Sequence, residues 1–187
     1  MRKDQIGRLI GGSFGFVFVQ ANAGALPTPA AIPLRVLAIL AFLRIVFAGR
    51  RAAVPAPAGD SDATASGGVG FGRGYWYVVA AEAVGLLAGL MLINKVLHTG
   101  TVAWITFVVG VHFFGLAVVW KRPDLHVLAG TMAACGVGGL VLAACGASAA
   151  VIAVVAGVAP GALLLGSVLW AGRAAVKGQP VDPGGAG

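Results

Sequence analysis

The chain has 187 residues, of which 59% are hydrophobic and only 10% are charged, and its formal net charge is +7. Ordinary globular domains carry about 25% charged residues, so a soluble domain of this length could not bury so much apolar surface. The basic residues form no contiguous patch with interleaved aromatic residues, which excludes nucleic acid as a partner. The composition therefore predicts that the lipid bilayer is the main partner of the chain.

Six apolar segments have close to the roughly 20 residues that a transmembrane helix needs. Turn and charge signals separate them, namely LPTPAAIP after the first, NKVLHTGT after the third, KRPD after the fourth and CGAS after the fifth. The pattern predicts an all-α, polytopic transmembrane helical bundle that forms a single domain over residues 1–187. Its six helices are expected at about residues 9–26, 32–49, 75–94, 102–120, 125–144 and 149–172.

Lysine and arginine are concentrated on one side of the membrane if the six segments alternate in direction. Cytoplasmic loops carry an excess of these residues, so this side is predicted to be cytoplasmic, with both termini inside (N-in/C-in). The opposite side offers only Lys95 and Arg35. The cytoplasmic set consists of Arg2, Lys3, Arg8, Arg50, Arg51, Arg73, Lys121, Arg122, Arg173 and Lys177.

Two polar stretches are predicted to lie outside the bundle. Residues 50–73 are rich in Pro, Ala, Gly and Ser, and we expect a flexible cytoplasmic linker there. Residues 174–187 are expected to form a disordered cytoplasmic tail. A protein partner could dock on the linker, although a plain tether is the preferred interpretation.

The first segment allows a second interpretation, as a secretory signal peptide. A basic start is followed by an apolar stretch and by QANAG, which places Ala21 and Ala23 for cleavage. Cleavage would leave five spans. The interruption GGSFG suits helix packing better than a signal-peptide core, and we therefore expect this segment to remain part of the bundle.

Small residues recur at four-residue spacing in three of the segments. In lipid, helices associate through close backbone approach across such residues, so these glycine-rich faces are predicted to be helix contacts within the chain, with binding of a partner as the second use. The sets are Gly7, Gly11 and Gly15; Gly85 and Gly89; and Ala153, Gly157 and Gly161.

Pro160 stands near the centre of the sixth segment. A proline lacks the backbone N–H and clashes with the carbonyl four residues earlier, here that of Ala156. We therefore expect a kink at this point, which more often shapes a bundle than serves as a gating hinge.

Three ionisable residues fall inside the predicted spans. Burying an ionisable side chain in lipid costs so much free energy that each of them is expected to need a partner. Arg44, Glu82 and His112 stand at similar distances from the cytoplasmic ends of three different segments. Their shared depth predicts an intramembrane polar cluster, in which Arg44 keeps Glu82 ionised and His112 shares its proton. The alternative is that Arg44 extends to the interface, while Glu82 is neutral and His112 bonds a backbone carbonyl.

Catalytic and cofactor motifs are missing from the sequence. There is no GxSxG elbow, HExxH helix, Walker A loop or Rossmann glycine pattern. The three histidines, His98, His112 and His126, do not have the local spacing of a zinc or haem set. We therefore expect no metal and no cofactor, and no catalytic residue is assigned.

The stretches IGRLIGGSFGFVFVQANAGALP, YWYVVAAEAVGLLAG and VVGVHFFGLAVVW together resemble uncharacterised polytopic integral membrane proteins of actinobacteria. The resemblance implies a bacterial inner-membrane location and no particular activity. We expect a non-enzymatic scaffold or accessory subunit, or a small carrier. The alternative is an intramembrane acid/base enzyme for a lipid-like or isoprenoid substrate, with Glu82 as the acid and His112 as its partner.

Overall fold

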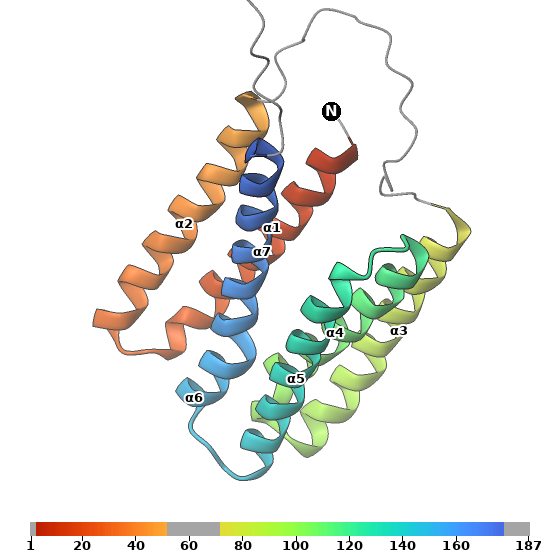
Figure 1. The fold of residues 1–187 in the computed structure, drawn as a ribbon. Coiled ribbons are helices and arrows are strands. Elements are labelled where there is room, and N and C mark those ends of the chain that lie inside the picture. Colours follow the sequence, from red (N-terminus) through yellow and green to blue (C-terminus); the bar gives the residue numbers. More distant parts are fainter. Residues whose placement is uncertain (1–2, 52–71, 178–187) are drawn as a thin grey trace, which may run out of the picture.

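The computed structural model describes residues 3–51 and 72–177, and nearly all of them are helical, which confirms the all-α class. Six long helical stretches alternate in direction along the chain (Figure 1). The last of them consists of three consecutive elements, α6, η3 and α7. The elements are α1 (Lys3–Asn22), η1 (Ala23–Ala25), α2 (Thr28–Arg51), α3 (Arg73–Val96), η2 (His98–Gly100), α4 (Thr101–Val119), α5 (Asp124–Ala144), α6 (Ala149–Ala153), η3 (Val154–Val158) and α7 (Ala159–Lys177).

The predicted linker and tail lie mainly outside the described residues. At the borders, α2 continues to Arg51 and α3 begins at Arg73. Residues 174–177, which were expected to begin the tail, continue α7.

Five helical stretches are long and apolar enough to cross a membrane: Thr28–Ala48, Arg73–Val96, His98–Val119, Asp124–Ala144 and Ala149–Arg173. They indicate an integral, multi-pass membrane protein in contact with the lipid bilayer. The first predicted span, residues 9–26, is not among them, and its last four residues lie beyond the end of α1 at Asn22. Charged residues in the first two turns of α1, and glycine, glutamine and asparagine further on, dilute its apolar residues.

The helices form two groups of three, with α1, α2 and α7 in one and α3, α4 and α5 in the other (Figure 1). Phe18, Val109, Met132 and Leu164 join the two groups in a buried cluster. A second buried cluster packs α2 against α1 and α7, through Val19, Ala38, Ile45 and Leu165. The centre of the bundle therefore connects α1 and α7 to α4 and α5, while α2 and α3 lie on opposite outer sides.

Large apolar side chains cover much of the outer surface. Leu37 of α2 and Leu87 of α3 are 62% and 64% exposed, whereas alanines such as Ala103 and Ala129 are fully buried. A water-soluble fold would reverse this distribution, because apolar surface is favourable only against lipid or protein. The arrangement supports burial of these helices in a membrane.

The predicted small-residue faces are used within the chain. A Cβ on Gly15 would lie 2.8 Å from the carbonyl oxygen of Gly161, and a Cβ on Gly161 would lie equally close to that of Gly15. The backbones of α1 and α7 therefore approach so closely that only glycine fits on either side. Gly157 packs in the same way against the buried side chain of Asn22.

The region before Pro160 forms a π-helical turn, η3, between α6 and α7. The wider turn accommodates the proline, whose missing N–H would have bonded the carbonyl of Ala156 in a regular α-helix. Thr106 of α4, which is fully buried, donates its hydroxyl proton to that carbonyl oxygen. A π-helical turn thus precedes Pro160, where the sequence predicts a kink, and a neighbouring helix supplies a hydrogen-bond donor to it.

Candidate functional site

Helices α3 and α4 pack antiparallel in a regular register, with small residues of one helix facing larger residues of the other. The ring of Trp104 lies so close to Gly89 that any side chain there would overlap it. The indole N–H of Trp104 donates to the carbonyl oxygen of Gly85 over 3.2 Å. The facing pairs along the two helices are Gly74 with Val119, Val78 with Gly115, Gly85 with Val108, and Gly89 with Trp104.

This register places Glu82 opposite His112. The Nδ1 atom of His112 lies 3.1 Å from Oε2 of Glu82, and the two side chains are 12% and 20% exposed. Nδ1 is buried and has no hydrogen-bond partner among the described residues, because the angle between the histidine ring and the carboxylate lies outside the hydrogen-bond range although the distance lies within it. The contact is therefore a close ionisable pair in which the histidine nitrogen retains unused hydrogen-bonding capacity.

The pair lies in a groove of about 570 Å³ between α3 and α4, which we call the α3–α4 groove. Glu82 and His112 are the ionisable residues of its lining, and most of the remaining surface is apolar. Three lining residues of α4 reach the outside of the bundle, since Val111 is 48%, Phe114 37% and Val118 70% exposed. The groove is consequently open toward the lipid.

Arg44 does not join the cluster that its depth predicted. It projects from α2, in the other group of three helices, and lines a separate pocket with Arg8 and Arg173. A shared depth in the membrane does not determine which helices are neighbours: α2 packs on α1 and α7, whereas α3 packs on α4. Of the three predicted residues, the structure brings together Glu82 and His112 and leaves Arg44 apart.

Several polar residues outside the groove have local partners. His126 Nδ1 lies 3.2 Å from the carbonyl oxygen of Pro123, and Asp124 pairs with Arg122 at the start of α5. The hydroxyl of Thr101 donates to Asn94 over 2.9 Å. Within the described residues, no group of three or more His, Cys, Asp or Glu side chains is arranged to hold a metal ion.

The groove also contains residues that sequence reasoning did not identify, above all Trp104 and Phe107. A usable signal existed, because Val78, Glu82 and Gly85 follow each other at helical spacing and form one face of α3. Gly85 on that face leaves room for a neighbouring helix beside the carboxylate, which is typical of a helix contact.

Comparisons with known protein families, with curated proteins and with solved structures give no match for this chain.

Proposed function

We propose that the protein is a small, non-enzymatic carrier of a membrane-dissolved molecule that has a long apolar body and one polar head. The observation that carries the proposal is the position of the Glu82–His112 pair in an otherwise apolar groove that opens toward lipid. An apolar lining with a few polar groups that fix orientation is typical of a ligand site. A hydroxyl or carbonyl head could bond the Glu82–His112 pair, while the apolar body lies along the groove.

We further propose that all six helical stretches cross the bacterial inner membrane, with both ends in the cytoplasm. Five stretches have the required length and apolarity, and α1 runs beside α2 and α7 through the bundle. The alternating directions bring Arg73, Lys121, Arg122 and Arg173 to one end of the bundle. An excess of basic residues is the property of the cytoplasmic side.

The groove supports a carrier better than an acid/base enzyme. Catalysis requires donors that stabilise the charge developing in the transition state, in addition to a proton donor and acceptor. Trp104, the other side chain of the groove with an N–H donor, already bonds Gly85. A scaffold or accessory subunit is the remaining alternative, and it would leave the groove without a ligand.

The proposal can be tested with radiolabelled farnesol, an isoprenoid alcohol with the required shape, in a binding assay on the detergent-purified full chain. We expect saturable binding that Val111→Trp abolishes, because the larger side chain fills the groove. Val127→Trp is the matched control, since Val127 is 77% exposed on α5 and does not line the groove. Glu82→Gln and His112→Gln should each weaken binding.

Three other outcomes would contradict the carrier. Conversion of farnesol into a product that depends on Glu82 would support the acid/base enzyme. Binding that survives Val111→Trp would place the ligand elsewhere on the protein. Absence of saturable binding, both for farnesol and for a quinone with a decyl chain, would favour the scaffold.

A further inference from the structure

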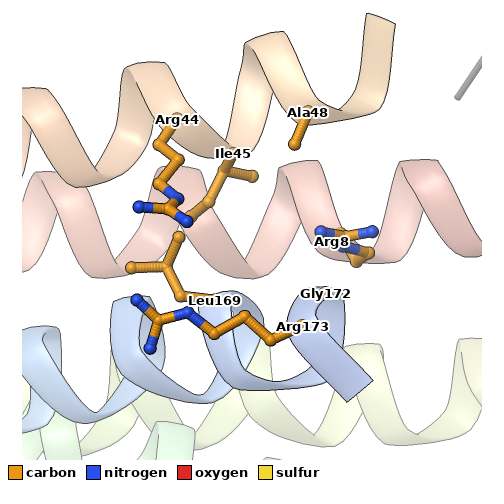
Figure 2. Close-up of a pocket in the computed structure, with 7 residues that line it drawn as sticks. All are labelled: Arg8, Arg44, Ile45, Ala48, Leu169, Gly172 and Arg173. Carbon is orange, nitrogen blue, oxygen red and sulfur yellow. The ribbon is translucent and has the colours of Figure 1, made fainter. Parts of the chain in front are cut away.

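Three arginines from three different helices line one pocket at the end of the bundle where α2 and α7 end (Figure 2). Arg8 comes from α1, Arg44 from α2 and Arg173 from α7, and the cavity has a volume of about 280 Å³. We call this cavity the arginine pocket. In Figure 2 the guanidinium groups of Arg44 and Arg173 point toward the part lined by Leu169, and Arg8 lies at the other end beside Gly172.

Among the side chains that the structure describes, no carboxylate forms an ion pair with these three arginines. Glu82 pairs with His112, and Asp124, which lines a neighbouring pocket with Arg8, pairs with Arg122. The Nε atom of Arg8 is buried and has no hydrogen-bond partner among the described residues. A buried donor without a partner is costly, and three like charges around one cavity repel each other, so an anion would stabilise the arrangement.

The guanidinium group of Arg8 lies close to Gly172 of α7. A Cβ on Gly172 would lie 2.3 Å from a terminal nitrogen of Arg8. Glycine at this position thus allows the guanidinium group to lie directly against the backbone of α7.

We propose that the arginine pocket binds the phosphate group of an anionic phospholipid from the adjacent leaflet. Guanidinium groups match phosphate oxygens in both charge and geometry. Basic pockets between transmembrane helices near the cytoplasmic side are typical sites for such headgroups. In the helical stretches that are long and apolar enough to cross a membrane, Arg173 is the last residue of Ala149–Arg173 and Arg44 stands four residues before the end of Thr28–Ala48, which places both near headgroup depth.

The rest of the lining favours a lipid over free phosphate. Ile45, Ala48 and Leu169 provide an apolar wall next to the charges. The glycerol and upper acyl chains of a lipid can cover this wall, whereas inorganic phosphate would leave it without a partner. The proposal concerns a different part of the bundle from the α3–α4 groove and does not depend on the carrier function.

The test is a titration of the purified full chain in a neutral detergent, with thermal unfolding as the readout. Phosphatidylglycerol should raise the melting temperature, and phosphatidylcholine and inorganic phosphate should have little effect. Arg8→Gln, Arg44→Gln and Arg173→Gln should each weaken the apparent affinity for phosphatidylglycerol by about fivefold, the value expected for one arginine near an anionic headgroup.

The matched control is Arg73→Gln, which removes the same charge at the same end of the bundle but outside the pocket. It should leave the affinity unchanged. Gly172→Ala keeps every charge and displaces Arg8, so it should also weaken binding.

Several results would overturn the proposal. If Arg73→Gln weakens binding as much as Arg44→Gln does, the lipid effect is a general attraction to the basic end. If inorganic phosphate stabilises the protein as well as phosphatidylglycerol does, the ligand is a free anion. If phosphatidylglycerol does not stabilise the wild-type protein, the pocket does not bind its headgroup.

Discussion

Thr106 of α4 donates its hydroxyl proton to the carbonyl oxygen of Ala156, which stands four residues before Pro160. In a regular α-helix that carbonyl would accept from the N–H of residue 160, which a proline does not have. A side chain distant in sequence therefore compensates for a local defect in the last helical stretch. This contact connects the two groups of helices at the depth where the π-helical turn lies.

Thr106→Val should lower stability by about 1 kcal/mol, the typical value of a hydrogen bond between membrane helices. The substitution keeps the shape of the side chain and removes only the donor, so the loss reports on the hydrogen bond. Thermal unfolding in detergent measures it, and Thr106→Ser should lose less. In a Pro160→Ala background the cost should shrink, because residue 160 regains an N–H. Equal costs in both backgrounds would disprove this compensation.

Gly161→Ala should destabilise the bundle, whereas Gly166→Ala on the same helix should not. The added Cβ at position 161 would lie 2.8 Å from the carbonyl oxygen of Gly15, while at position 166 nothing lies within 4 Å. Overpacking of this kind costs about 1–3 kcal/mol. Alanine at 166 should be neutral or slightly stabilising, because its helix propensity exceeds that of glycine by about 1 kcal/mol. Similar melting temperatures for the two variants would contradict the close α1–α7 contact.

Leucine substitutions at Glu82 and His112 should show strong coupling in a double-mutant cycle. Each single variant leaves the other ionisable group without its partner in an apolar groove, which is costly. The double variant removes both groups and should be more stable than the sum of the single effects predicts, by about 0.5–3 kcal/mol. Thermal unfolding of the four proteins at one pH provides the comparison. Additive effects would mean that the two residues do not interact.

The native cysteines allow a direct test of the proposed orientation. Cys145 is exposed in the connection between α5 and α6, at the end of the bundle opposite the basic one. A membrane-impermeant maleimide added to intact spheroplasts should therefore label the wild-type protein, and Cys145→Ser should abolish the labelling. In the Cys145→Ser background, Lys121→Cys should react only after permeabilisation. The reverse pattern at both positions would place the basic end outside.

The sequence by itself determined the class of the protein and the approximate ends of its helices. Long apolar segments can satisfy their backbone in lipid only as helices, so composition and length were sufficient for this step. It also identified Gly15 and Gly161 as contact residues, because small residues at four-residue spacing are a local property of one helix. The position of the irregularity followed from Pro160 alone.

Only the tertiary structure decided which helices are neighbours, and this determined the candidate sites. Arg44, Glu82 and His112 share a depth in the membrane. Depth alone does not determine where each helix stands in the plane of the membrane, and therefore which helices are adjacent. Membrane helices are apolar on lipid-facing and protein-facing sides alike, so periodicity could not show that α2 packs on α1 and α7. The packing therefore separated Arg44 from Glu82 and placed it with two other arginines.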